Sequence, residues 1–314
     1  MREDAGAAIL LSGLSKRFGA AVAVRDASLE VMRGEIFGLI GPDGAGKTTI
    51  LRVLSGVMSA DSGAVLVDGV DVRSHPEQVR SRISYMPQRF GLYEDLTVDE
   101  NIRFYADVFE VPRALREERA SRLLGASGMA EFRRRLAGQL SGGMKQKLGL
   151  TCSLVHAPRI VLLDEPTTGV DPVSRREFWQ ILYRLRAGGV TIVISTAYFD
   201  EAERCDRLAL LYGGAVRYCE SPLALRARMP GALLEIATPA ARLARNVLSL
   251  QPGVLSALTV GDGIHVHVDD AARRRSELGD ALRAHAVPFG EIREVTPNVE
   301  DLFVALLAPE AKAA

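Results

Sequence analysis

Short apolar runs rich in Val, Ile and Leu alternate with amphipathic stretches along residues 7–220. The clearest apolar runs are EIFGLIG, RIVLLDE and VTIVIST. Runs of this length indicate buried strands, and their alternation with helical patterns is typical of a parallel sheet covered by helices. The sequence therefore predicts an α/β core in this region.

One helix in this core is marked at both ends, in the stretch DPVSRREFWQILYRLRAGG. Asp171 is a suitable N-cap, Pro172 suits the first turn, and Gly188 suits the end. The apolar positions expected on its buried face are Phe178, Ile181, Leu182 and Leu185. Their spacing is that of one helical face.

Two further regions follow different patterns. Residues from about 90 to 157 are helical with little strand signal, so we expect a helical subdomain inserted in a first domain of residues 1–220. A linker at 221–230 then precedes a last segment, 231–314. Its pattern predicts a strand, a helix, two strands, a helix, a strand and a helix, with LLEIAT, VLSALTV and GIHVHVDD as strands. This indicates a small C-terminal α/β domain.

Composition sets limits on partners. The 314 residues are 47% hydrophobic and 25% charged, enough for a sizeable core and two domains. Lys plus Arg equals Asp plus Glu, so no basic surplus favours nucleic acid. The locally basic clusters FRRRL and ARRRSEL are expected to be solvated helix faces. We therefore expect no nucleic-acid partner.

Cysteines and apolar runs bear on the compartment. The chain has three cysteines, Cys152, Cys205 and Cys219. Their spacing is not that of a metal site, and their odd number favours a reducing compartment. The longest uncharged run, within 245–262, is too short and too broken by Pro and Gly to span a bilayer. The N-terminus lacks the apolar core of an export signal, so we expect a cytoplasmic protein.

The stretch GPDGAGKT fits GxxxxGK[ST] and lies between an apparent buried strand and an apolar helix. Its glycines let backbone N–H groups converge on phosphate oxygens at a helix N-terminus. Lys47 can neutralise phosphate charge, and the Thr48 hydroxyl can reach Mg²⁺. The predicted binding residues are Gly41, Pro42, Asp43, Gly44, Ala45, Gly46, Lys47, Thr48 and Thr49.

A second phosphate-side element is RIVLLDEP. Its strand delivers Asp164 and Glu165 at the carboxyl end, where open α/β sheets bind ligands. Asp164 can hold the Mg²⁺ shell, and Glu165 can polarise a water for in-line attack on the terminal phosphate.

A third element, QLSGGMKQKLGL, places Ser141 and two glycines before a helix. The N-terminus of this helix is therefore a second possible anion-binding site. The apolar positions close to one face of this helix are Met144, Leu148, Cys152 and Val155. Two such elements indicate either two anions or one anion held between two subunits.

Together these elements resemble the nucleotide-binding subunit of ATP-binding cassette (ABC) transporters, over about residues 7–220. Gly41–Thr48 matches the Walker A loop of this family, and the strand ending at Asp164 matches Walker B, with Glu165 as catalytic residue. The signature motif matches Leu140, Ser141, Gly142, Gly143 and Met144, with Met where Gln is usual. The resemblance implies a P-loop NTPase core with a mixed sheet, and ATP and Mg²⁺ as cofactors.

The resemblance also implies partners. Two cassettes sandwich two ATP molecules, each between one subunit's Walker A loop and the other's Ser141, Gly142 and Gly143. A cassette without a membrane span needs a separate transmembrane permease, which places it on the inner face of the cell membrane.

Smaller elements carry over from the family. Phe18 in KRFGA stands where an aromatic stacks on adenine, although a core position is the alternative. Gln88 matches the glutamine that touches Mg²⁺ and the attacking water. Asp171 in TTGVDP matches a loop that crosses the dimer interface.

One position departs from the family pattern. Ala197 in ISTAYFDE stands where a histidine normally contacts the terminal phosphate. Loss of one such donor typically costs roughly 3–4 kcal/mol of barrier. We therefore expect ATP binding with slow hydrolysis at this site, and an intact signature that completes a better-equipped partner's site. A homodimer with two slow sites is the alternative.

Within the family, GPDGAGKTT, STAYFDEAERCDRLALLYGG and TPNVEDLFVALL most resemble exporter ATPases of the drug and antibiotic efflux type. Their C-terminal extension carries no catalytic signature here, and dimerisation or regulation is its expected role. His265 and His267 lie on one strand face without a third metal ligand, so an ordinary strand face is expected.

Two other functional classes stay open. An ABC ATPase acting on the ribosome or on DNA would usually show two cassettes, a coiled-coil insertion or a basic linker, and none is seen. A regulatory module that uses ATP as a structural clamp is compatible with Ala197.

Overall fold

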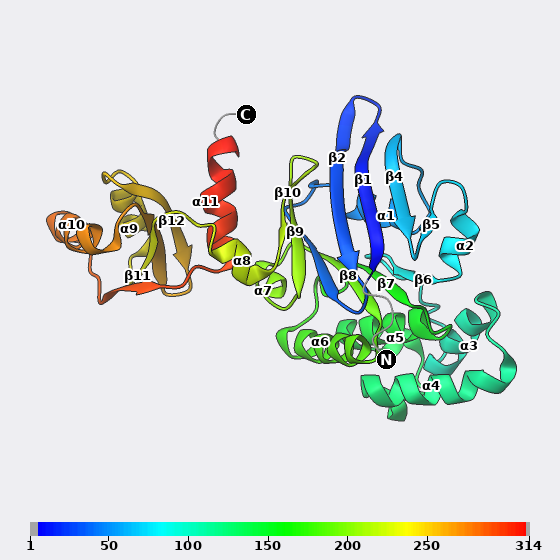
Figure 1. The fold of residues 1–314 in the computed structure, drawn as a ribbon. Helices are drawn as coiled ribbons and strands as arrows, with labels where there is room; N and C mark the ends of the chain where they lie inside the picture. Colours follow the sequence, from blue (N-terminus) through cyan, green and yellow to red (C-terminus); the bar gives the residue numbers. More distant parts are fainter. Residues whose placement is uncertain (1–5, 312–314) are drawn as a thin grey trace. The chain divides into compact units, whose positions relative to one another are not determined.

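The computed structural model describes the backbone of residues 6–311 and the side chains of residues 6–305. The described chain forms two compact units. One contains the residues up to Glu201 together with Cys205–Cys219, and the other contains Ala202–Arg204 together with the chain from Glu220 onward (Figure 1). Within the described range, no helix is both long and apolar enough to cross a membrane.

A six-stranded sheet in the order β10-β9-β3-β8-β7-β6 forms the centre of the first unit. Its strands are β3 (Ile36–Ile40), β6 (Ile83–Met86), β7 (Ile160–Asp164), β8 (Thr191–Thr196), β9 (Arg207–Tyr212) and β10 (Ala215–Glu220). The strands from β9 to β6 run parallel. Every residue of β3, β7 and β8 is buried, as expected of strands covered on both faces, so the three apolar runs are confirmed as strands.

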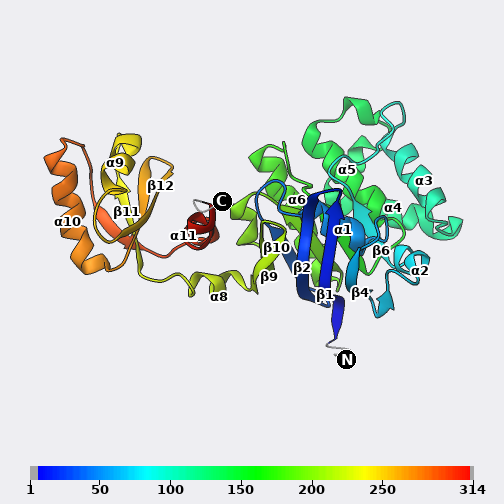
Figure 2. The same cartoon turned by 90° about the horizontal axis from the view of Figure 1, so that it is seen from above.

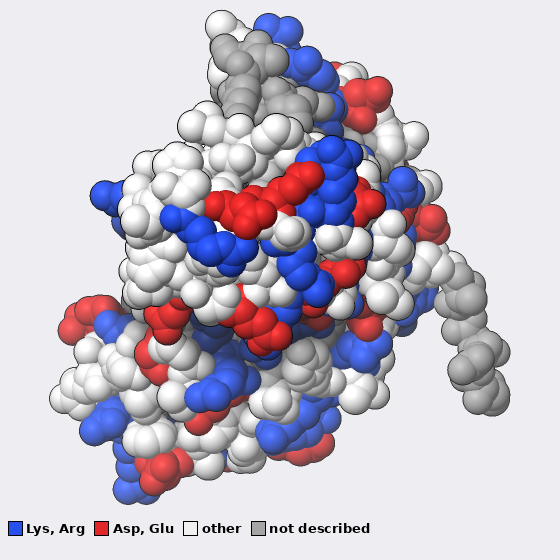
Figure 3. Space-filling view, turned by 90° about the vertical axis from the view of Figure 1, so that its left-hand side faces the viewer, with Lys and Arg blue, Asp and Glu red and all other residues white. Residues whose placement is uncertain are grey.

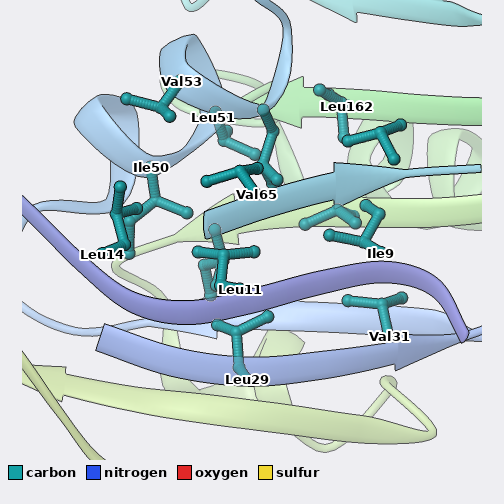
Figure 4. Packing of buried hydrophobic residues seen from close by; sticks show 14 of the residues in the cluster. Ile9, Leu11, Leu14, Leu29, Val31, Ile50, Leu51, Val53, Val65 and Leu162 are labelled. Atoms are coloured by element: carbon teal, nitrogen blue, oxygen red, sulfur yellow. The ribbon is translucent and has the colours of Figure 1, made fainter. Parts of the chain in front are cut away.

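An antiparallel sheet in the order β2-β1-β4-β5 lies over one side of this sheet. Its strands are β1 (Ala7–Phe18), β2 (Ala21–Met32), β4 (Ser62–Val67) and β5 (Val70–Asp71). Side chains from both sheets and from α1 (Lys47–Leu54) form one core, shown in Figure 4 by residues such as Leu11, Leu29, Ile50, Val65 and Leu162. The sequence pattern did not separate this second sheet from the first, because its strands alternate buried and exposed positions irregularly around several bulges.

The helices α5 (Gly142–Leu154) and α6 (Pro172–Ala187) form a second core with the central sheet. The Asp171 carboxylate accepts the N–H groups of the first turn of α6, and Gly188 is its C-cap, both as predicted. On the predicted face Phe178, Ile181 and Leu182 are buried and Leu185 is partly buried, and Trp179 beside them is fully buried. The chain also forms two short helices, α2 (Pro76–Arg80) and α7 (Phe199–Ala202).

Residues 90–157 are helical, as predicted. They form α3 (Val98–Val108), α4 (Arg113–Ser127) and α5, with 3₁₀ turns at Ala130–Phe132 and Ala137–Gln139. Thr97 begins α3 with a capping box to Glu100. The helices share a core of their own that includes Ile102, Leu124, Leu148, Cys152 and Val155.

The second unit begins with α8 (Pro222–Arg226), inside the stretch expected to be a linker. Then follow β11 (Ala232–Ala237), α9 (Ala241–Leu248), β12 (Val254–Val260), β13 (Gly263–Val268), α10 (Ala271–Ala284), β14 (Ile292–Val295) and α11 (Val299–Ala311). This is the predicted element order, and the antiparallel order β12-β13-β11-β14 makes it a ferredoxin-like βαββαβ unit. The helices α9 and α10 cover one face of this sheet, and α11 lies on the other (Figure 2).

The expectation that both arginine clusters are solvated helix faces holds only in part: FRRRL is not helical at its arginines, and on α10 Arg273 and Arg275 of ARRRSEL are exposed whereas Arg274 is buried. In FRRRL, Arg133 follows a 3₁₀ turn and pairs with Asp99 and Glu117. In ARRRSEL, Arg274 is only 6% exposed because its guanidinium lies against Asp269, with 2.7 Å between Nη2 and Oδ2. On the face drawn in Figure 3, basic and acidic side chains are interspersed rather than gathered by sign.

Candidate active site

The carboxyl ends of the parallel strands meet at one edge of the central sheet. The register aligns Ile40 of β3 with Thr196 of β8, and Asp164 of β7 with Ser195 of β8. The loop that starts at Gly41 leaves this edge and leads into α1. Ligands of open α/β sheets bind at such an edge.

The loop before α1 is shaped by two glycines that have no room for a side chain. A Cβ on Gly41 would lie 2.4 Å from the carbonyl oxygen of Leu211, and a Cβ on Gly46 would lie 2.5 Å from that of Ala23. Gly46 also has a φ of 102°, in the region that favours glycine. As the N-cap of α1 it offers no side-chain hydrogen bond, which leaves first-turn N–H groups free for an anion.

Lys47 is the buried cation of the site, 4% exposed. Its Nζ donates to the carbonyl oxygens of Gly41 and Pro42, at 2.8 and 3.1 Å. The same Nζ lies 3.2 Å from Oε1 of Glu165. The site thus places a lysine and a carboxylate together at the phosphate loop.

Glu165 receives two further contacts on its other oxygen. The Gln88 amide donates to Oε2 at 3.2 Å, and the Thr168 hydroxyl does so at 3.4 Å. Its backbone has a φ of 47°, which is uncommon for a residue other than glycine. Gln88 therefore meets Glu165, while its predicted metal contact stays a prediction.

Asp164 is almost fully buried and accepts three hydroxyl groups. Thr48 donates to Oδ1 at 3.0 Å, Ser195 to Oδ1 at 2.7 Å, and Tyr85 to Oδ2 at 3.2 Å. Burial and the neighbouring Asp164 raise the pKa of Tyr85 to about 12. The phenol therefore stays protonated at neutral pH and donates this hydrogen bond. A hydroxyl and a carboxylate placed together are ligands that suit Mg²⁺.

Lys47, Thr48, Gln88 and Glu165 line one cavity of about 580 Å³, whereas Asp164 is not among its lining residues and reaches it through Thr48. Its lining residues are Phe18, Ala23, Asp43, Gly44, Ala45, Gly46, Lys47, Thr48, Thr49, Gln88, Glu165 and Thr168. The Phe18 ring is 50% exposed, with Lys16 Nζ 5.8 Å from its centroid, so it is open to stacking rather than part of a core.

The signature segment lies elsewhere in the described chain and does not line this cavity. Ser141 caps α5, where its hydroxyl accepts the Met144 N–H at 3.3 Å. Leu140 is buried among the helices, and Gly143 packs against Ser174. Asp171 and Ala197 are likewise not among the described lining residues. The roles predicted for all these residues stay predictions.

Ser195, Tyr85 and Thr168 were not singled out from the sequence. Their positions are a signal that the sequence offers. Ser195 and Tyr85 are polar residues near the carboxyl ends of β8 and β6, the two strands that flank β7. Thr168 lies three residues after Glu165.

Two histidines outside the site form hydrogen bonds within the protein, and two cysteines are buried. Nδ1 of His265 lies 2.9 Å from Oδ1 of Asp301, and His267 bonds to the carbonyl of Pro230. Cys152 and Cys205 are buried free thiols, and burial raises the pKa of each.

Comparisons with known proteins agree with this geometry. The family model described as ABC transporter matches residues 24–168. The probable multidrug ABC transporter ATP-binding protein YbhF of Escherichia coli is 42% identical over 308 residues, covering 96% of this chain and 52% of YbhF. The chain therefore spans about half the length of that relative.

Other relatives match along nearly their whole length. The daunorubicin resistance ATP-binding protein DrrA2 of Streptomyces coeruleorubidus is 32% identical over 306 residues, covering 96% of this chain and 95% of DrrA2. A solved structure of an ATP-binding subunit of an ABC transporter is 30% identical with a TM-score of 0.64, covering 70% of this chain and 92% of that one.

Proposed function

The chain belongs to the ABC transporter family, and on this premise we propose that it is the ATP-binding subunit of an exporter, coupling ATP binding and hydrolysis to a separate transmembrane permease. The observation that carries the proposal is that Lys47, Thr48 and Glu165 line one glycine-shaped cavity, with the Asp164 carboxylate hydrogen-bonded to Thr48.

Each group has a task that follows from its position. The loop N–H groups and Lys47 bind the phosphates, so Lys47 exchanges its carbonyl partners for phosphate oxygens. Thr48 and Asp164 would hold Mg²⁺, which neutralises charge on the phosphates when bound. Phe18 stacks on the adenine.

Glu165 is the proposed general base. It accepts a proton from the water whose oxygen attacks the terminal phosphorus, while the bond to the bridging oxygen breaks and ADP leaves. Gln88 already contacts this carboxylate at 3.2 Å and orients it. The Lys47–Glu165 contact must loosen before the carboxylate can serve the water.

Hydrolysis at this site is proposed to be slow because of Ala197. A methyl group neither donates a hydrogen bond nor stabilises charge on the transferred phosphoryl group. Ser141, Gly142 and Gly143, which do not line the chain's own cavity, would complete the site of a second cassette, either a copy or a different chain.

The partners follow from the family. We propose that the permease holds the cassette on the inner face of the membrane and contacts it near Gln88 and the helical region. The names of YbhF and DrrA2 refer to multidrug transport and daunorubicin resistance, which supports a drug-type cargo here. The equal numbers of basic and acidic residues, and their interspersed positions on the face drawn in Figure 3, support a function without nucleic acid.

A second candidate is a regulatory cassette in which ATP acts as a clamp. Ala197 favours it, because binding groups are present while one hydrolytic donor is absent. Tight binding without turnover would distinguish the clamp from the exporter subunit.

The testing experiment compares ATP binding and steady-state hydrolysis of the wild type with Ala197→His and Glu165→Gln. We expect all three to bind ATP, the histidine variant to hydrolyse about a hundredfold faster than the wild type, and that gain to vanish when Glu165→Gln is added. Fast hydrolysis by the wild type, unchanged by Ala197→His, would show the account of position 197 to be wrong. No turnover in any variant would favour the clamp.

A further inference from the structure

Ser195 is a fully buried serine on β8, paired with Asp164 at the end of β7, and Glu165 directly follows that strand. Its Oγ donates to Oδ1 of Asp164 at 2.7 Å. The same Oγ accepts the backbone N–H of Glu165 at 3.0 Å, and the Ser195 carbonyl accepts that N–H at 3.1 Å. The single hydroxyl proton goes to the carboxylate, which leaves the lone pairs for the amide.

The Glu165 backbone needs such a restraint. With its φ of 47°, it occupies the small left-handed region, which costs free energy for a residue with a side chain and persists when its surroundings enforce it. Both Ser195 acceptors converge on its N–H and hold the peptide between Asp164 and Glu165 in one orientation.

The Asp164 carboxylate is restrained by the same hydroxyl. We have proposed Thr48 as a magnesium ligand, so its hydroxyl would serve both the metal and Oδ1. Ser195 and Tyr85 then remain as donors dedicated to the two carboxylate oxygens.

We propose that Ser195 is a positioning residue that sets the proposed metal-holding carboxylate of Asp164 and the proposed base Glu165 in fixed relation to each other. This inference rests on the proposed function and adds to it a residue that the family motifs did not indicate. Ser195 is fully buried and is not among the residues that line the cavity, so it acts through its two neighbours.

The chain offers a matched control in Ser84. It is a buried serine on β6, the strand on the other side of β7, and its Oγ has no hydrogen-bond partner among the described residues. Ser84→Ala, like Ser195→Ala, removes one buried serine hydroxyl. It breaks no hydrogen bond to Asp164 or Glu165.

The experiment uses the full chain with Ser195→Ala, Ser84→Ala and Glu165→Gln, and the shape-matched pair Ser195→Thr and Ser195→Val. Single-turnover hydrolysis of ATP labelled in its terminal phosphate is followed over a range of Mg²⁺ concentrations. Binding of ATP without Mg²⁺ and the melting temperature report whether each variant is folded.

We expect Ser195→Ala to slow hydrolysis by about tenfold to a hundredfold, because a hydrogen bond to a charged group is lost. It should also raise the Mg²⁺ concentration at half-maximal rate, while ATP binding without Mg²⁺ stays unchanged. Ser84→Ala should match the wild type, and Ser195→Thr should exceed Ser195→Val in rate because only Thr keeps the hydroxyl.

Two outcomes overturn the inference while leaving the proposed function intact. One is Ser195→Ala matching Ser84→Ala in rate and Mg²⁺ dependence while Glu165→Gln is slow. The other is equal behaviour of folded Ser195→Thr and Ser195→Val. If Glu165→Gln hydrolyses as fast as the wild type, the proposed base fails instead, and with it the premise. If neither the Thr nor the Val variant folds, the comparison with Ser84→Ala decides.

Discussion

The pair of His265 and Asp301 shows how much a single residue's surroundings can change its chemistry. The side chains are 12% and 2% exposed, and the Asp301 carboxylate also accepts the Asn298 N–H at the start of α11. The hydrogen bond with Asp301 raises the pKa of His265, with Glu235 and Glu300 adding to the effect against desolvation. Because α11 is tied to β13 through this pair, its docking depends on the charge of one imidazole.

The sign of the pH dependence follows from that shift. A folded-state pKa above the ordinary value of 6.5 means that the contribution to stability is complete below about pH 6.5 and is lost as pH rises through the folded-state pKa. We expect the protection factors of the β13 and α11 amides, which compare each exchange rate with the intrinsic rate at the same pH, to fall over this range in the wild type. His265→Gln should show low protection at every pH, and wild-type protection factors that do not change with pH would contradict the role of the pair.

At the scale of elements, Gly143 sets how closely α5 approaches α6. A Cβ at this position would lie 2.4 Å from both Cβ and Oγ of Ser174. The next glycine, Gly142, has nothing within 4 Å of such an atom. Close packing of α5 against α6 therefore explains why a glycine is needed at position 143, independently of any contact with nucleotide.

We expect Gly143→Ala to lower the free energy of unfolding by about 1–3 kcal/mol through overpacking. Gly142→Ala should not lower it, since alanine is the better helix former. Adding Ser174→Gly to Gly143→Ala removes both clashing atoms and should recover part of the loss. Thermal unfolding of the wild type, Gly143→Ala, Ser174→Gly and the double variant measures this coupling, and strictly additive effects would show that the contact does not limit how closely α5 and α6 approach.

For the whole molecule, the proposed function assigns two half-sites to one chain. The cavity carries the phosphate loop and Glu165, while the exposed Ser141 lies outside its lining. In a two-fold dimer, the phosphate loop of each copy can face the Ser141 segment of the other copy. Such a dimer therefore permits two equivalent composite sites. This arrangement is part of the proposed function and can be tested by mixing.

We expect Lys47→Ala and Ser141→Arg each to abolish hydrolysis when purified alone, because each damages both composite sites of a homodimer. A one-to-one mixture should recover about a quarter of the wild-type rate, since half of the dimers are mixed and each mixed dimer has one intact site. The rate is measured after mixing at high protein concentration. No recovery, with exchange of subunits verified, would indicate a different partner cassette.

Elements whose signals are local can be predicted from the amino-acid sequence alone. Buried parallel strands appear as continuous apolar runs, helix α6 has its cap, proline and apolar face within a few residues, and the phosphate loop is one short segment. The βαββαβ order of the second unit also follows from local periodicity. Residues such as Lys47, Thr48 and Asp164 were therefore accessible from spacing alone.

Contacts between groups that are distant in the sequence become visible in the three-dimensional fold. The hydroxyls of Ser195 and Tyr85 reach Asp164 because β8 and β6 flank β7, a strand order that no local pattern encodes. In the same way, Arg274 was expected on a solvated face and is buried, since Asp269 compensates its charge across a turn. Local signals record what each segment prefers, whereas hydrogen bonds between strands depend on register and order, which the whole chain sets together.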